Sequence, residues 1–162
     1  MTPTHAGALQ VTRESLASFR ASVNDLPQEA LDWQPLPSAN SAAVLVLHAI
    51  TATRFFLRAG SGDVRSLIEY RNNERADAFR TAGVAKTELI QMLRDFGDEA
   101  ETILAAGTEA HLGATVSMPS DGTFSVPDRN GAGTLFGAIA HLREHLGHIQ
   151  LMHDLWLTEH PG

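Results

Sequence analysis

The sequence contains no cysteine among its 162 residues, and this absence excludes several kinds of site. Without a thiol side chain the protein has no disulfide, no thiolate metal ligand and no cysteine nucleophile. Any thiol chemistry would therefore have to use the sulfur of a substrate. The sequence also lacks a G-x-S-x-G elbow and a P-loop, so it offers no motif for a serine hydrolase or for nucleotide binding through a P-loop.

Long apolar runs and positive charge are also scarce. No apolar run approaches the roughly 20 uncharged residues that a bilayer span needs, and the start, MTPTHAGALQVTRESL, has neither the basic region nor the apolar region of a secretory signal. The net charge of −7 opposes contact with a phosphate backbone, and no stripe of lysine and arginine offsets it. We therefore expect a cytoplasmic protein that binds neither nucleic acid nor a membrane.

The residues that are present favour helices. Hydrophobic residues make up 43% of the chain and charged residues 19%, the balance of one globular domain over residues 1–162. Apolar residues recur at helical spacing in four segments. These segments cover residues 7–26, 41–60 and 86–107, and a last one runs from the glycines of RNGAG to about Trp156. The pattern predicts an all-α fold, a four-helix bundle, and connections of about 25 residues that allow neighbouring helices to run parallel.

Two connections could contribute to a site. The segment GSGDVRSLIEYRNNERADAFRTAG is long and charged, so it is either a wall or lid over a site or a solvated crossover with one helical turn. The segment HLGATVSMPSDGTFSVP has short β-prone runs around SDG, which suggests a small hairpin or an irregular loop.

Four histidines crowd the last helix. His141 and His145 are separated by four residues, so both imidazoles lie on one face about 6 Å apart and can bind one metal ion. His148 stays near that face but lies about 10 Å along the axis from His141, too far to share the ion easily. His153 points elsewhere and His160 follows the helix end, so we expect both at the surface.

Two histidines from one helix would hold a divalent ion weakly, so a third ligand is expected from a facing helix. His48 lies in the apolar run AAVLVLHAITA, where a lone buried imidazole is costly unless it is hydrogen-bonded or bound to a metal. A satisfied core histidine is the alternative. Three neutral imidazoles leave coordination positions open for water or substrate, as in catalytic sites. With an ordinary histidine pKa near 6.5, binding would weaken below about pH 6.

Two segments resemble a known family. LDWQPLPSANSAAVLVLHA and HLREHLGHIQLMHDLW are similar to the entry of the second helix and to the fourth-helix signature of the DinB/YfiT-like proteins. This resemblance implies an up-down-down-up bundle, often a homodimer, with a divalent metal on His48, His141 and His145. Zinc or nickel fits best, and iron or manganese is an alternative. His148 departs from the family pattern because glutamine is common there, and His153 stands where many members have arginine.

The family also implies a reaction class. Its members resemble metal-dependent thiol transferases and the maleylpyruvate isomerase that uses mycothiol, so a low-molecular-weight thiol is the expected partner of a small electrophilic substrate. No catalytic residue stands out. We expect Glu144 at the surface, and Glu69, Glu74 and Asp77 solvated in the crossover. A metal- or ligand-binding bundle without turnover and a metal-free dimeric bundle are the alternatives.

Overall fold

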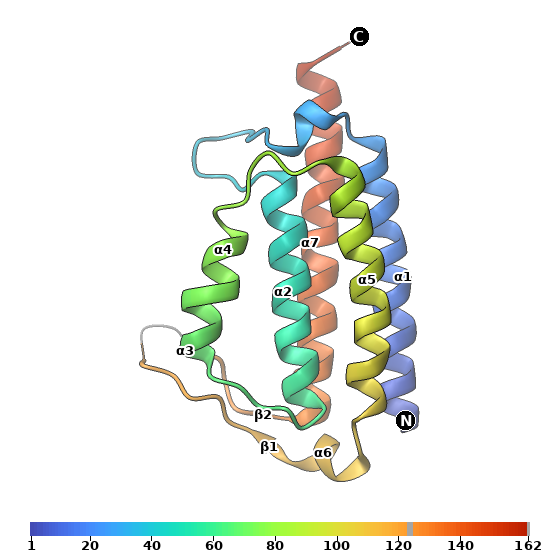
Figure 1. Cartoon of the computed structure of the whole chain (residues 1–162), viewed down its shortest axis with the longest axis vertical. Coiled ribbons are helices and arrows are strands. Elements are labelled where there is room, and N and C mark those ends of the chain that lie inside the picture. The colour runs from blue at the N-terminus through green and yellow to red at the C-terminus, as the bar shows by residue number, and fades with distance from the viewer. Residues whose placement is uncertain (123–124, 162) are drawn as a thin grey trace.

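The computed structural model describes residues 1–122 and 125–161 and shows a bundle of four long helices (Figure 1). Two of them, α1 and α7, run in one direction, and α2 and α5 run in the other, so the order along the chain is up-down-down-up (Figure 1). This confirms the predicted fold class. The bounds of the four helices are Pro3–Asp25 for α1, Ala42–Gly60 for α2, Lys86–Ala105 for α5 and Gly131–Glu159 for α7.

Each long helix packs against two others. The helix α1 contacts α5 and α7, and α2 also contacts α7 and α5, so α1 and α2 lie on opposite corners of the bundle. Their apolar stripes meet in one core, in which Phe19, Leu57, Phe96 and Leu142 are almost fully buried. By length and composition alone α2 could cross a membrane, but 72% of its apolar window is buried inside the protein. Its place in the core accounts for its composition.

Helix caps explain why α1 and α7 begin earlier than the apolar pattern predicts. In α1 the hydroxyl of Thr2 accepts a hydrogen bond from the His5 amide at 3.3 Å, and Pro3 occupies the first helical position, which favours proline. In α7 the side-chain oxygen of Asn130 accepts from the Gly133 amide at 2.8 Å. This cap lets the helix begin at Gly131 despite the low helix propensity of glycine.

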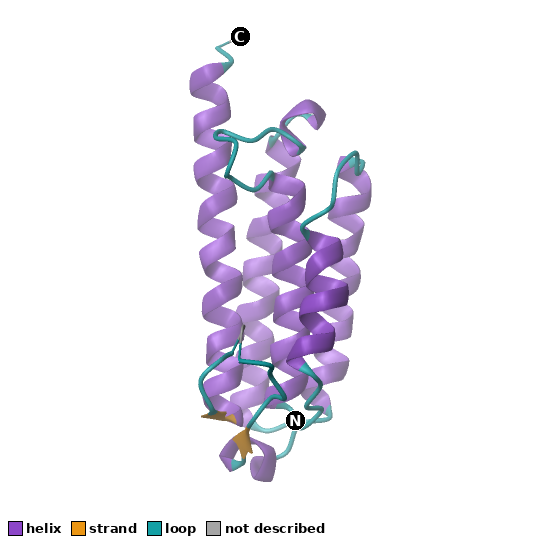
Figure 2. Ribbon diagram, turned by 90° about the vertical axis from the view of Figure 1, so that its left-hand side faces the viewer, coloured by secondary structure: helices purple, strands orange, loops and turns teal. Residues whose placement is uncertain are grey.

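The crossover after α2 is more helical than the single turn considered above. It contains α3 (Leu67–Tyr70), the π-helical segment η2 (Arg71–Arg75) and α4 (Ala76–Ala78), which together form a continuous arm beside α2 (Figures 1 and 2). Tyr70 fixes its lower end by stacking on Phe55 with ring centroids 4.5 Å apart. The arm is therefore a wall of the bundle. The earlier connection contains only the short 3-10 helix η1 (Gln28–Leu31).

The connection between α5 and α7 carries a two-stranded sheet, the one sheet among the described residues. After α6 (Glu109–Gly113), strand β1 (Thr115–Val116) pairs antiparallel with β2 (Arg129–Asn130). Strand β1 therefore lies near the start of the predicted hairpin region and β2 just after its end, not directly around SDG, and residues 123–124 of that region lie outside the described residues. This pairing fixes the segment to the lower end of α7.

Glycine permits a close approach of α2 and α7 at that same end. A Cβ atom on Gly60 would lie 2.9 Å from the Gly131 carbonyl oxygen, and one on Gly131 would lie 2.8 Å from the Gly60 oxygen. Both distances are shorter than side chains tolerate. The two glycines therefore bring the end of α2 into direct contact with the beginning of α7.

Candidate metal centre

Three histidines converge between α2 and α7. His48 lies in the middle of α2 with 7% of its surface exposed, and His141 and His145 are half-buried on the facing side of α7. One nitrogen of each ring can be chosen so that all three lie within 4.8 Å of one another. The structure thus brings together the three residues that the sequence predicted as ligands, and this group could hold a metal ion.

The arrangement of the nitrogens fits a divalent ion. Tetrahedral zinc with Zn–N distances of about 2.0–2.1 Å separates its ligand nitrogens by roughly 3.3 Å, and the Nε2 atoms of His141 and His145 are 3.2 Å apart. Within the described part of the chain, the buried Nδ1 atom of His48 has no hydrogen-bond partner. Buried polar nitrogens without partners are costly, so the donor set is suited to an ion.

Burial keeps these imidazoles neutral. It lowers the pKa of His48 to about 4, with the charges of His141 and Arg75 acting in the same direction. Burial also lowers the pKa of His145 to about 3, helped by the neighbouring histidines. The pKa of His141 is lowered by burial as well, against the nearby Glu144 carboxylate, which raises it. Because a metal ligand must be neutral, protons compete for this site at a lower pH than an ordinary histidine pKa would suggest.

The other histidines of α7 lie outside this group. The Nδ1 atom of His148 is 3.4 Å from Nδ1 of His145, so this exposed residue is placed to orient a ligand ring from the rim. His153 is paired with Asp154 at 3.1 Å, and His160 follows the end of α7 and stacks on Trp156 with ring centroids 3.7 Å apart. His160 is exposed and His153 partly so.

The arm of α3, η2 and α4 closes one side of the centre. The ring of Phe79, directly after α4, lies 4.8 Å from the ring of His48, and the guanidinium carbon of Arg75 lies 4.5 Å from the Phe79 ring centroid. The acidic residues of the arm lie elsewhere. Asp77 pairs with Arg80, while Glu69 and Glu74 line a separate hollow beside Tyr70.

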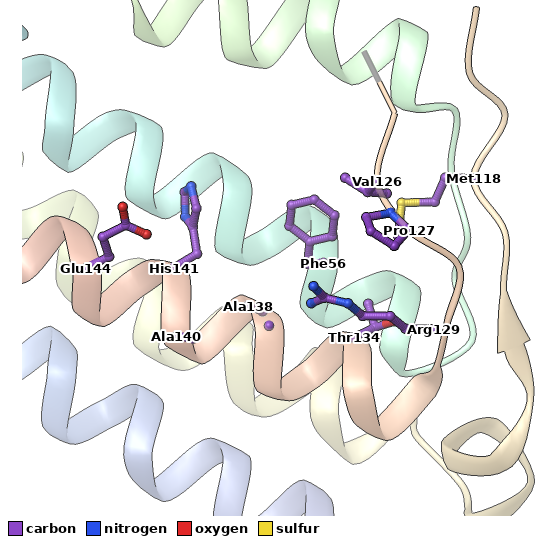
Figure 3. A pocket seen from close by; sticks show the side chains of 11 residues that line it. Phe56, Met118, Val126, Pro127, Arg129, Thr134, Ala138, Ala140, His141 and Glu144 are labelled. Carbon is purple, nitrogen blue, oxygen red and sulfur yellow. The ribbon is translucent and has the colours of Figure 1, made fainter. Parts of the chain in front are cut away.

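A pocket of about 310 Å³ opens beside His141 (Figure 3). Its apolar wall consists of Phe56 from α2 and residues of the β1–β2 connection, namely Met118, Val126 and Pro127. Arg129 and Glu144 contribute charged groups to its lining. The pocket places an open volume next to the candidate ligands, as a substrate site requires.

Glu144 lies at the edge of the pocket. It is exposed, as expected, but it lines the pocket together with His141 (Figure 3). Glu144 is adjacent to His145 in the sequence but lies about 100° from it around the helix. The relevant neighbour is His141, three residues before, because residues at that spacing share a face.

Comparison with known proteins agrees with this architecture. The sequence profile of the DinB superfamily matches residues 11–149. The chain belongs to the DinB superfamily. No curated protein matches the sequence significantly.

Solved structures share this DinB fold at low sequence identity. YfiT from Bacillus subtilis, described as a probable metal-dependent hydrolase with an unusual four-helix bundle topology, has a TM-score of 0.68 and 16% identity over 94% of this chain and 87% of its own. The DinB-like protein YjoA from the same organism has a TM-score of 0.66 and 16% identity over 91% and 90%. The mycothiol-dependent maleylpyruvate isomerase gives 0.61 and 15% over 91% of this chain and 62% of its own.

Proposed function

We propose that this protein is a metal-dependent enzyme that transfers a low-molecular-weight thiol to a small electrophilic substrate. In this proposal His48, His141 and His145 hold one divalent ion, zinc or nickel before iron or manganese. The observation that carries it is the convergence of three neutral imidazoles within 4.8 Å beside an open, largely apolar pocket. A site that only stabilised the bundle would not need that pocket.

Different residues around the site can serve different roles in the reaction. A bound divalent ion supplies Lewis acidity, which lowers the pKa of a thiol or a water molecule. Glu144 lines the pocket beside His141, so its carboxylate can accept the thiol proton while the sulfur bonds to the electrophilic carbon of the substrate and the leaving group, such as the halide of an aryl halide, departs with its bonding electron pair. His148 orients the His145 ring through their 3.4 Å contact, and Phe79 keeps water from the buried face of His48.

The choice of thiol over water rests on two features. The chain has no cysteine of its own, and one structural relative is a mycothiol-dependent isomerase. Water is the competing nucleophile, since YfiT is described as a probable metal-dependent hydrolase. We also propose that the protein works in the cytoplasm, where small thiols are kept reduced.

We further propose that the protein acts as a homodimer joined through α7. Phe136 and Leu151 are 60% and 56% exposed on this helix. They lie about 60° apart around the helix axis and roughly 22 Å apart along it. Large apolar side chains exposed on one side of a helix support an interface there.

Elemental analysis of protein purified without a histidine tag tests the metal directly. The expected result is one divalent ion per chain, lost in His48→Ala. The metal-loaded protein is then assayed with an aryl halide and cysteine, glutathione or mycothiol, and with an aryl ester and no thiol. Thioether formation that needs both metal and thiol supports the proposal. Ester hydrolysis alone would favour a hydrolase, and bound metal without either reaction would favour the non-catalytic binder.

A further inference from the structure

The pocket beside the candidate metal centre carries an arginine, Arg129, at the end away from His141. Arg129 of β2 lines the pocket at one end, and His141 and Glu144 line it at the other (Figure 3). Arg129 lies in β2, which leads directly into the first turn of α7, whereas His141 lies further along that helix. A ligand in this pocket would therefore meet an arginine at the end remote from the candidate metal.

Arg129 is exposed, but its backbone is held by the elements around it. Its strand pairs with β1 through Val116, and the next residue, Asn130, caps α7. The guanidinium then lies over Gly137, where a Cβ atom would overlap Nη1 of Arg129. Because Gly137 has no side chain, the guanidinium can pack against α7 at this position, which we call the seat. The guanidinium is directed along the helix toward the pocket (Figure 3).

The charge of Arg129 has no carboxylate partner in the described part of the chain. Most other arginines do have one, namely Arg13, Arg54, Arg58, Arg65, Arg71 and Arg80. An arginine fork presents donors that match a carboxylate in two parallel hydrogen bonds. In a protein of net charge −7, a seated arginine that lines a pocket and lacks an internal partner is suited to an anionic ligand.

The distance between the two ends of the pocket and the residues that line it indicate the length and polarity of the rest of the ligand. Gly137 and His141 are one turn of α7 apart, which corresponds to about 6 Å along the axis. Phe56, Met118 and Val126 line the space between the two ends with apolar surface. An occupant would therefore have a carboxylate at one end, an apolar body of a few carbon atoms, and its reactive group at the other end.

We propose that Arg129 binds the carboxylate of a small apolar acid whose opposite end reaches the candidate metal at His141. This inference rests on the proposed function for the direction of the substrate, because the reacting end is the end at the histidines. It assigns the substrate class: short aliphatic or aromatic carboxylic acids that carry an electrophilic carbon away from the carboxylate.

Binding of 3-phenylpropanoate and of its neutral amide to the metal-free protein, measured by calorimetry or NMR titration, tests the assignment without any catalytic activity. The wild type should bind the acid about ten-fold or more tightly than the amide, since charge-assisted pairs are the stronger ones. Arg129→Met should remove this preference, and Arg129→Lys should retain part of it. Arg143→Met is the matched control, because Arg143 lies on α7 and contacts Ser15 outside the pocket lining; it should bind as the wild type does.

A second pair of variants tests the seat without removing the charge. Gly137→Ala should displace the guanidinium and weaken acid binding several-fold, whereas Gly147→Ala, on the same helix with open space around it, should not. Equal binding of acid and amide by the wild type, wild-type binding by Arg129→Met, or no binding of the acid at millimolar concentration would overturn the assignment. Loss of metal binding alone would refute the proposed function and leave this preference for the acid in place.

Discussion

Gly60 and Gly131 set the register of α2 against α7 so that His48 lies level with the midpoint between His141 and His145. Gly60 lies 12 residues after His48, and residue 143 lies 12 residues after Gly131. Because the helices are antiparallel and touch at the two glycines, equal lengths of helix on both sides bring these positions opposite each other. The contact at the bottom of the bundle therefore aligns a site several turns above it.

Substitution at Gly131 should disturb both the fold and the site. A Cβ atom there would meet the backbone oxygens of Gly60 and His111, so we expect Gly131→Ala to lower the free energy of unfolding by about 1–3 kcal/mol and to weaken zinc binding. Gly147→Ala adds its Cβ to open space and should raise stability by up to about 1 kcal/mol. Urea unfolding and competition with a zinc chelator measure the two effects. Unchanged zinc affinity in a folded Gly131→Ala variant would contradict the register argument.

Metal should raise the melting temperature through the three converging histidines. An ion present at about 100 times its dissociation constant adds about 2.7 kcal/mol, or roughly 5–10 °C for a chain of this size. His48→Ala, His141→Ala and His145→Ala should each lose most of this shift with zinc or nickel. His153→Ala and His160→Ala are the controls and should keep it, while His148→Ala should lose only part. A full metal response in His48→Ala would show that α2 contributes no ligand.

Acid should destabilise the metal-free protein in a defined range. Burial lowers the pKa of His48 to about 4 and that of His145 to about 3, whereas the unfolded chain titrates near about 6.5. The unfolded state therefore binds more protons between these values, so the free energy of unfolding should fall as pH drops from about 6.5 toward 4. Urea unfolding in a chelator at several pH values measures the slope. His48→Leu should flatten it, and His153→Leu should not.

The lowered pKa values also change the pH expected for metal release. An ordinary histidine would begin to release an ion below about pH 6. Since protons compete with the ion only near the folded-state pKa, zinc should remain bound at about pH 5.5. Zinc dissociation followed with a colorimetric chelator checks this. Release that is half-complete above about pH 6 would mean that these imidazoles titrate like exposed ones.

The homodimer should depend on the exposed apolar residues of α7. Phe136→Glu and Leu151→Glu put charge on this face, so we expect the mass from light scattering to fall from two chains to one. Leu36→Glu is the control, because Leu36 is 63% exposed but lies in the connection before α2. A monomeric wild type across micromolar concentrations would refute the dimer.

The helical spacing of residues in the sequence was sufficient to predict the four-helix bundle and the histidine group. The apolar stripes predicted four helices, and the i, i+4 spacing of His141 and His145 predicted a shared point for two ligands. His48 followed from the cost of burying an imidazole in an apolar helix. Each of these features depends on contacts within one helix or on burial, and both can be predicted from local sequence.

The rest of the site depends on contacts between distant segments. Arg129 reaches the pocket because a two-residue strand pairs across 13 positions of chain, from Val116 to Arg129, and strands so short carry little pattern. Phe79 lies beside His48 only because the polar arm is helical and packs on α2. The seat at Gly137 depends on space left beside α7, which no spacing in the sequence encodes.

Because Phe79 covers His48, we expect the affinity of the centre for an ion and the rate at which the ion exchanges to depend on different parts of the fold. Phe79 directly follows the arm, whose middle segment, η2, buries no side chain, whereas His48 belongs to the packed core of α2. Segments with few buried contacts open more readily than a core. We therefore expect the arm to open while the four long helices stay folded, so that the ion exchanges faster than the protein unfolds. Affinity would be determined by α2 and α7, and residence time by the arm.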